Sequence, residues 1–217
     1  MKLIFASSNK NKIREISALL PSHIQLLGLA DVGITEEIPE PGATIKENSF
    51  LKAKYVAERL KSVTVFADDS GLEVEALDNA PGVYSARYAG IPKCDEANNK
   101  KLLKELEKIT KRHARFVTVI TLITDLFPDS QSDSLYNPFL KSLSFGEGFR
   151  VRHFEGVIKG TIAYESRGKN GFGYDPLFIP QGYRSTFAEL SAEEKNKISH
   201  RAIAVKKLLE FLEGFDC

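Results

Sequence analysis

Short runs of consecutive apolar residues alternate along this chain with longer segments in which apolar residues recur every three or four positions. Leu3 to Ala6 is a run of the first kind and predicts a buried strand. The segment after it predicts a helix, because one of its faces would carry Ile13, Ile16, Leu19 and Leu20. Thr44 and Glu47 have the spacing of a capping box, and the apolar pattern after them predicts a second helix from about Thr44 to Leu60.

The middle of the chain continues this alternation. Thr64 to Ala67 predicts a strand that ends at Asp68-Asp69-Ser70-Gly71, so we expect the two aspartates at a strand end or turn before a half-exposed strand begins at Leu72. Asp95 can cap a helix that follows it. Phe116 to Ile123 has the β-branched composition of a long central strand.

The last third of the chain contains one irregular segment and one clear helical pattern. Residues 127–148 are punctuated by Pro, Ser, Asp and Asn, which indicates a loop insertion rather than a domain boundary. Near the C-terminus, Ser191 or Ser199 would cap a helix with the apolar stripe Ile198, Ala202, Val205, Leu209 and Leu212. Helices and strands thus alternate from end to end, which predicts an α/β fold in a single domain over residues 1–217.

Composition narrows the classes of partner. The 217 residues contain 30 Lys and Arg against 29 Asp and Glu, so no chain-wide basic field is available for a nucleic acid polymer or a membrane surface. Cys94 and Cys217 lack metal-ligand spacing and form no disulfide framework. No apolar run approaches the roughly 20 residues that span a bilayer. We therefore expect a cytoplasmic protein that binds any anion locally.

Two N-terminal segments have polar residues suited to phosphate or metal binding. The residues from Ser7 to Lys12 join a strand to a helix N-terminus, where free N–H groups favour an anion, although an ordinary helix cap would look the same. Glu40 lies between two prolines that restrict its loop, which suits a carboxylate presented to a cation as well as a solvated acidic loop. Asn48 and Lys52 share one helical face and could reach a phosphate or only water.

The remaining candidates lie in the acidic motif and in the C-terminal third. Asp69, with Asp68 as an additional candidate, could bind Mg²⁺, or both could belong to a turn in which Gly71 has a positive φ. Glycines on both sides of Phe172 favour close packing of a flat ligand. The other candidates for nucleotide binding are Gly173, Tyr174, Asp175, Lys195, His200 and Arg201.

Taken together and in order, these motifs resemble those of the inosine triphosphate pyrophosphatases, also called Ham1-like or noncanonical purine nucleoside triphosphate pyrophosphatases. The resemblance spans the whole chain and includes Pro81-Gly82-Val83-Tyr84-Ser85-Ala86-Arg87 and Ser199-His200-Arg201. It implies a long mixed β-sheet flanked by helices, two lobes with a central substrate cleft, and a homodimer. It also implies Mg²⁺-dependent hydrolysis of dITP, ITP and XTP to the monophosphate and pyrophosphate.

The resemblance assigns roles to individual residues. Glu40 and Asp69 would hold the magnesium, and Asp69 would also orient or deprotonate the attacking water. The substrate would be bound by Ser7, Ser8, Asn9, Lys10, Asn11, Lys12, Ser70, Phe172, Gly173, Tyr174, Asp175, Lys195, His200 and Arg201.

Two other functions stay open at this point. A Maf-like pyrophosphatase would catalyse the same reaction on other modified nucleotides, and a panel of substrates would separate the two. A nucleotide-binding module without turnover is the second alternative, but it would have no need for both Glu40 and Asp69.

Overall fold

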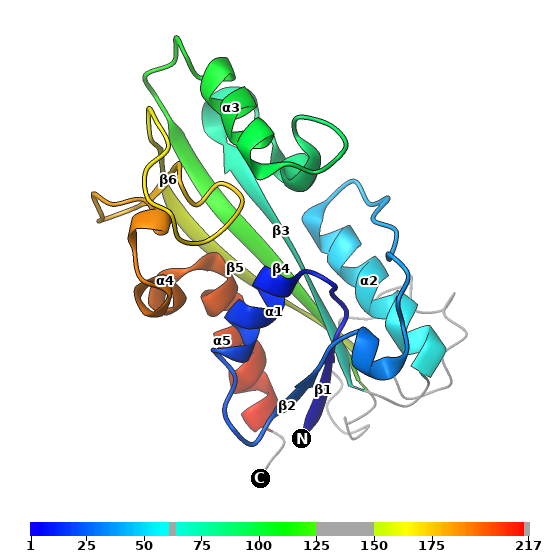
Figure 1. Cartoon of the computed structure of the whole chain (residues 1–217). Helices are drawn as coiled ribbons and strands as arrows, with labels where there is room; N and C mark the ends of the chain where they lie inside the picture. The colour runs from blue at the N-terminus through cyan, green and yellow to red at the C-terminus, as the bar shows by residue number, and fades with distance from the viewer. Residues whose placement is uncertain (61–63, 125–149, 215–217) are drawn as a thin grey trace.

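The computed structural model describes residues 1–60, 64–124 and 150–214. Its centre is a six-stranded mixed sheet with the order β2-β1-β3-β4-β5-β6 (Figure 1). The strands are β1 (Lys2–Phe5), β2 (Gln25–Leu27), β3 (Val65–Val74), β4 (His113–Thr124), β5 (Arg150–Ile162) and β6 (Phe178–Pro180). β1 pairs in parallel with β2 and β3, and the remaining pairs are antiparallel. The predicted α/β fold with a long mixed sheet is confirmed.

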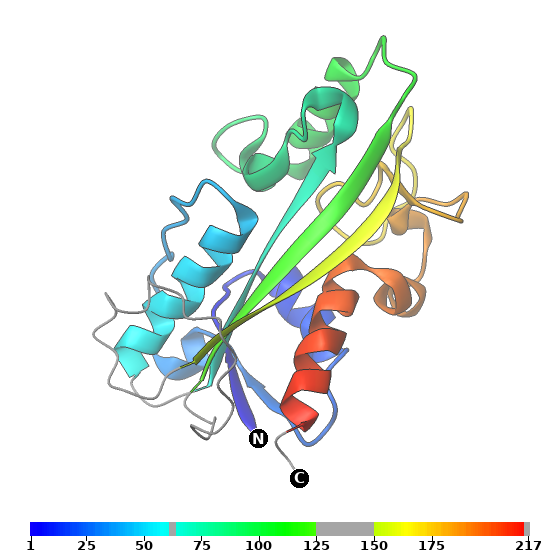
Figure 2. The same ribbon diagram turned by 180° about the vertical axis from the view of Figure 1, so that it is seen from behind.

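Helices cover both faces of the sheet, as Figures 1 and 2 show from opposite sides. They are α1 (Lys10–Ser17), α2 (Ile45–Leu60), α3 (Asp95–Glu105), α4 (Ala192–Ile198) and α5 (His200–Glu213). Side chains of successive strand residues point to opposite faces. Accordingly, Ile120 and Leu122 of β4 pack in one cluster with α5, whereas Ile123 packs in another with α2.

The acidic motif lies inside a strand, not at its end. β3 continues without interruption from Val65 to Val74, so the prediction of a strand end or turn at Asp68-Asp69-Ser70-Gly71 was wrong. The alternative role for Gly71, a turn with positive φ, was also wrong. A Cβ on Gly71 would lie 2.4 Å from the carbonyl oxygen of Gly82, so the glycine is needed for the close approach of the 3-10 helix Gly82–Arg87.

Helix caps were predicted with mixed success. Ser191 and Ser199 were alternative caps for one helix, but the chain uses both, because Ser191 begins α4 with a capping box and Ser199 begins α5. Asp95 does not cap α3, whose N-cap is Cys94. The Asp95 carboxylate instead accepts a hydrogen bond from the Gly173 N–H at 2.7 Å. The predicted loop insertion at 127–148 lies outside the described residues.

Candidate active site

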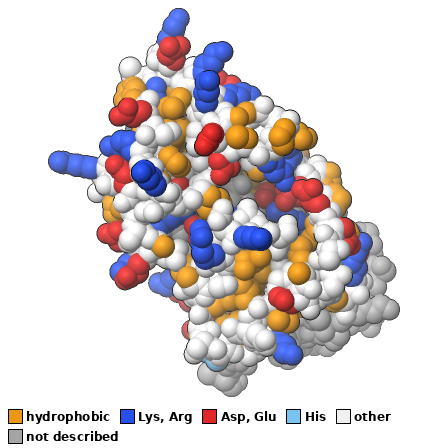
Figure 3. All heavy atoms as spheres, viewed as in Figure 1, with side chains coloured by type: hydrophobic (Ala, Val, Ile, Leu, Met, Phe, Trp, Pro, Cys, Tyr) orange, Lys and Arg blue, Asp and Glu red, His pale blue; other side chains and the backbone are white. Residues whose placement is uncertain are grey.

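A cleft opens between the elements on the two faces of the sheet, and its walls come from segments far apart in sequence. Figure 3 shows the surface hollowed near the centre of this face, where acidic and basic side chains meet. The walls include the loop before α1, the loop before α2, the middle of β3, the segment before α3, the 172–175 loop and the start of α5. The two-lobed arrangement thus brings together the N-terminal, central and C-terminal motifs.

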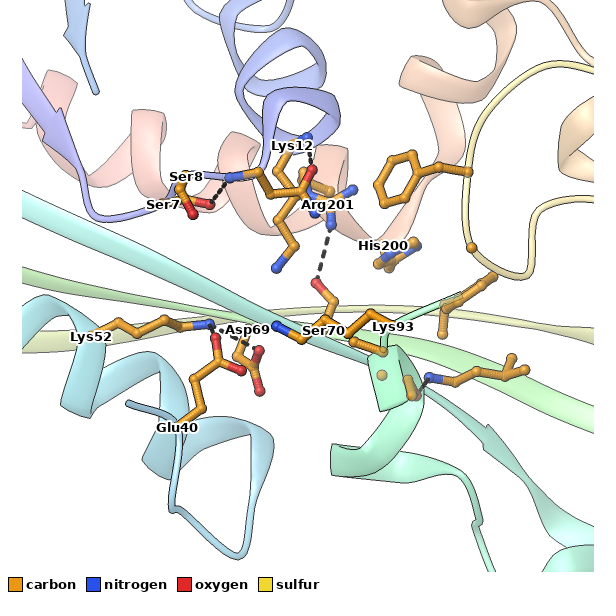
Figure 4. A pocket seen from close by; sticks show the side chains of 18 of the residues that line it. Ser7, Ser8, Lys12, Glu40, Lys52, Asp69, Ser70, Lys93, His200 and Arg201 are labelled. Carbon is orange, nitrogen blue, oxygen red and sulfur yellow. Dashed lines mark hydrogen bonds and ion pairs between the residues drawn. The ribbon is translucent and has the colours of Figure 1, made fainter. Parts of the chain in front are cut away.

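One end of the cleft is formed by two carboxylates and a lysine. Lys52 of α2 directs its ammonium to Glu40 Oε1 at 2.8 Å and to Asp69 Oδ1 at 3.0 Å (Figure 4). All three residues line the cleft, although Lys52 is only 6% exposed and Asp69 7%. The two carboxylates therefore converge on one positive charge. Convergent carboxylate oxygens are the donors that Mg²⁺ prefers in proteins, so Glu40 and Asp69 fit the metal that the sequence predicts.

Burial acts differently on these two carboxylates. Burial raises the pKa of Asp69 above its ordinary value, although the charge of Lys52 opposes the shift. Burial alone would also raise the pKa of Glu40, but Lys52 outweighs it, so the net pKa of Glu40 is lowered. Asp69 is accordingly a better proton acceptor than an ordinary aspartate, whereas Glu40 stays charged.

Asp68 points to the opposite face of β3, as expected for the residue before Asp69. Its Oδ1 accepts from Lys12 Nζ at 3.0 Å, and its Oδ2 accepts from Arg201 Nε at 3.2 Å. These cations lower its pKa well below the ordinary value despite complete burial. Asp68 does not line the cleft. The structure therefore groups Glu40 with Asp69 and gives Asp68 the different role of positioning Lys12 and Arg201.

Glu15 was missed by the sequence analysis. This α1 residue accepts from Lys195 Nζ at 2.8 Å and also binds Arg201 Nη1, so it joins α1 to α4 and α5. Arg201 further donates to Ser70 Oγ at 3.2 Å (Figure 4). A single glutamate on a predicted helix gives no signal of such a role, because its partners are 180 and 186 positions away in the sequence.

The other end of the cleft is aromatic and basic. Asp175 accepts hydrogen bonds from the backbone N–H of Phe172 at 2.8 Å and from Lys195 Nζ. These bonds fix the turn from residue 172 to residue 175. The ring of Phe172 lies 5.0 Å from Lys195 Nζ, a cation–π distance. His200 packs its ring against Phe116 at 4.6 Å, and burial lowers the pKa of His200 well below its ordinary value. The imidazole is therefore neutral, with one N–H to donate.

Gly173 and Tyr174 line the cleft and are held there by hydrogen bonds to neighbouring segments. The N–H of Gly173 donates to Asp95, and Asn99 Nδ2 of α3 donates to the Gly173 carbonyl at 3.0 Å. Tyr174 is 4% exposed and its hydroxyl donates to the Ser85 carbonyl at 3.0 Å. Tyr174 thus anchors the loop in the core, so Phe172 is the aromatic residue left free to meet a flat ligand.

The phosphate-binding candidates divide into two groups. Ser7, Ser8, Asn9 and Lys12 line the cleft together with Lys52. Asn9 also caps α1 by accepting from the N–H groups of residues 11 and 12, so the helix-cap alternative is true of this residue as well. Lys10, Asn11 and Asn48 do not line the cleft.

Asn48 instead supports the loop that carries Glu40. The residue is 1% exposed, and its Oδ1 accepts from the Gly42 N–H at 2.7 Å. A Cβ on Gly42 would lie 2.6 Å from the same oxygen, so this glycine is required for the contact. The structure therefore assigns Asn48 to positioning of Glu40 rather than to contact with phosphate.

Comparisons with known proteins agree with this geometry. A model described as the Ham1 family matches residues 3–211. Proteins named dITP/XTP pyrophosphatase from Christiangramia forsetii and Bacillus subtilis are 48% and 43% identical, over 98% and 97% of this chain and 99% and 96% of their own. The Ham1 protein structures from Staphylococcus aureus and Coxiella burnetii match at 40% and 35% identity with TM-scores of 0.80 and 0.81, and each match covers 99% of both chains. The chain therefore belongs to the Ham1 family.

Proposed function

We propose that this protein hydrolyses the noncanonical purine nucleoside triphosphates dITP, ITP and XTP to the monophosphate and pyrophosphate. The observation that carries the proposal is one cleft with two chemically different ends. Glu40 and Asp69 converge at one end, and Phe172, Lys195 and His200 form the other. The names of the relatives supply the substrate class, since several are called dITP/XTP pyrophosphatase. Both supports also count against a Maf-like enzyme and a binding module.

Magnesium is the metal we assign to Glu40 and Asp69. In the part of the chain that the structure describes, no cluster of three or more metal-ligating residues occurs. Two carboxylates suffice for Mg²⁺, which completes its coordination with water and phosphate oxygens. When bound, Mg²⁺ would neutralise phosphate charge and make water a better nucleophile. Lys52 would keep both carboxylates aligned through the hydrogen bonds described above.

The protein residues have separable roles in the reaction. Asp69 orients the attacking water and can accept its proton, a role that its raised pKa favours. Lys12 and the loop from Ser7 to Asn9 hold the phosphate chain at the start of α1. Most of the lowering of the barrier comes from positioning and charge neutralisation, as in other phosphoryl transfers.

Recognition of the base follows from its hydrogen-bonding groups. Hypoxanthine and xanthine present an oxygen acceptor at C6 where adenine presents an amine donor. The recess beside Phe172 is lined by the donor residues Lys195, His200 and Arg201, and the buried Nδ1 of His200 has no hydrogen-bond partner among the described residues. A site built on such a hydrogen bond can reject the mismatched base by a factor of about 10⁴.

The assembly and location of the protein are also proposals. We propose a homodimer in the cytoplasm, as the sequence resemblance implies. None of the helices in the described ranges has the length and apolar character needed to cross a membrane. Sedimentation equilibrium of the purified protein would test the dimer, and a monomer over a wide concentration range would contradict it.

A panel of substrates tests the proposed reaction. Pyrophosphate release with Mg²⁺ is measured from dITP, XTP, dGTP, dATP and dTTP at matched concentrations, beside the variant Asp69→Asn. We expect release mainly from dITP and XTP, and its loss in the variant. Release from a pyrimidine alone would point to the Maf-like reaction, and nucleotide binding without release would point to a binding module.

A further inference from the structure

Among the residues that the structure describes, five cationic side chains line the cleft, but one of them is held differently from the rest. The five are Lys12, Lys52, Lys93, Lys195 and Arg201. Four of them pair with carboxylates of which at most 30% of the side chain is exposed. Lys93 instead pairs with Glu37 at 3.0 Å, and the side chains are 55% and 82% exposed. Exposed ion pairs of this kind contribute little free energy, so Lys93 is the cation most easily released.

Lys93 lies near the end of the cleft that Glu40, Lys52 and Asp69 form. Glu37 lies three residues before Glu40 on the loop that precedes α2, whereas Lys93 lies on the segment that precedes α3. The ion pair therefore joins two separate segments, and both of its members line the cavity. Figure 4 labels Lys93 beside Ser70 in this cavity. The charge of Lys93 also contributes to lowering the pKa of Glu40, so its ammonium is within electrostatic reach of that carboxylate.

Substrate binding changes the balance of charge at this point. The cations deeper in the cleft are already neutralised by Glu15, Glu40, Asp68, Asp69 and Asp175. A triphosphate brings several negative charges into a site with few uncommitted cations. A lysine that exchanges an exposed carboxylate for a phosphate keeps a charge-assisted hydrogen bond, and its partner then carries more negative charge. The loss of the exposed ion pair costs little free energy.

We propose that Lys93 leaves Glu37 and binds the terminal phosphates of the substrate, so that Glu37 competes with the substrate for this lysine. The inference rests on the proposed function, because it takes a nucleoside triphosphate as the ligand. Lys93 and Glu37 then act in opposite directions on substrate affinity. No bond is formed or broken in this exchange.

The test uses this opposition of sign. Lys93→Ala should raise KM for dITP about tenfold with kcat within about twofold, the signature of lost binding in ground and transition states alike. Lys93→Arg keeps the charge and should stay near the wild-type KM. Glu37→Gln should lower KM about twofold, but it should have no effect in the Lys93→Ala background. Lys206→Ala, which removes an exposed ion pair with Glu210 on α5, is the matched control.

Product binding shows which part of the substrate Lys93 contacts. Calorimetry in Mg²⁺ buffer should show weaker pyrophosphate binding to Lys93→Ala by about the same tenfold factor, with dIMP binding unchanged. Wild-type affinity of Lys93→Ala for pyrophosphate would overturn the inference, as would a loss confined to dIMP. This measurement needs no turnover. A wild-type protein that fails to hydrolyse dITP would thus refute the proposed function while the role of Lys93 is still tested.

Discussion

Replacement of Asp68 or of Asp69 by asparagine should affect different properties of the protein, because the two side chains point to opposite faces of β3. The Asp68 carboxylate is stabilised in its charged form by Lys12 and Arg201, and its pKa is lowered. The Asp69 carboxylate is disfavoured in its charged form by burial, and its pKa is raised. Asp68→Asn should therefore destabilise the fold, whereas Asp69→Asn should mainly abolish turnover.

The expected change in the free energy of unfolding depends on which ion-pair partners each variant leaves for the neighbouring cations. Breaking a buried ion pair by removing one partner destabilises a protein by about 3–5 kcal/mol. Arg201 would keep Glu15 and Ser70 in Asp68→Asn, but Lys12 would have no carboxylate within ion-pair distance among the described residues. We therefore expect the lower limit, about 3 kcal/mol, which corresponds to a Tm lower by roughly 6–12 °C. In Asp69→Asn, Lys52 keeps Glu40, and we expect a change within about 1 kcal/mol.

Denaturant unfolding measures both variants directly. The chain contains no tryptophan, so the transition should be followed by far-ultraviolet circular dichroism. Turnover of dITP is measured on the same preparations. The pH dependence of the free energy of unfolding gives a further check. The stabilisation from Asp68 is present above the ordinary pKa of aspartate and is lost as pH falls toward its lowered value. An Asp68→Asn variant as stable as the wild type, or an equal loss in Asp69→Asn, would refute the reasoning.

Three further changes test other parts of the structure. Gly156→Ala should destabilise the fold by about 3 kcal/mol and impair activity, because its Cβ would lie 2.0 Å from the His200 carbonyl oxygen. Thermal unfolding and turnover measure these effects, and a variant as stable as the wild type would contradict the prediction. Burial lowers the pKa of His153 to about 4, so between about pH 6.5 and 4 only the unfolded chain binds this proton and the free energy of unfolding falls as pH falls. The difference in free energy of unfolding between pH 7.5 and pH 5 should be smaller by about 1 kcal/mol in His153→Gln. An unchanged pH profile in the variant would exclude this role. Asp95→Ala should raise KM for dITP several-fold because Gly173 loses its N–H acceptor, whereas Asp95→Asn should not; equal kinetics of the two variants would count against the contact.

The sequence predicts those elements that local patterns determine. The capping box at Thr44 and Glu47 indicated α2 to within one residue, and β-branched composition indicated the central strand β4. It failed at Asp68 to Gly71, because two aspartates and a glycine are unfavourable in strands by composition alone. Here ion pairs with Lys12 and Lys52 stabilise the aspartates, and the approach of Gly82 requires Gly71. Tertiary contacts thus override the local preference.

The candidate site was predicted better in its residue types than in its connections. Glu40, Asp69, Lys52, Phe172 and His200 all line one cleft, although their motifs are far apart in the sequence. The separate roles of these residues could not be predicted from the sequence, because they depend on which face of a strand or helix each side chain occupies after folding. The pairing of Glu15 with Lys195, and of Asn48 with the Gly42 backbone, joins residues that no local pattern connects.

The central claim is that this cleft selects hypoxanthine-type nucleotides and splits them between the α- and β-phosphates. The most direct measurement is the initial rate of dIMP and pyrophosphate formation from dITP, compared with the rates from dGTP and dATP on the same Mg²⁺-loaded preparation. We predict equal amounts of dIMP and pyrophosphate, with dATP slower in kcat/KM by about 10³-fold or more because it presents an amine at C6. Formation of dIDP and orthophosphate, or equal rates from all three nucleotides, would contradict the account.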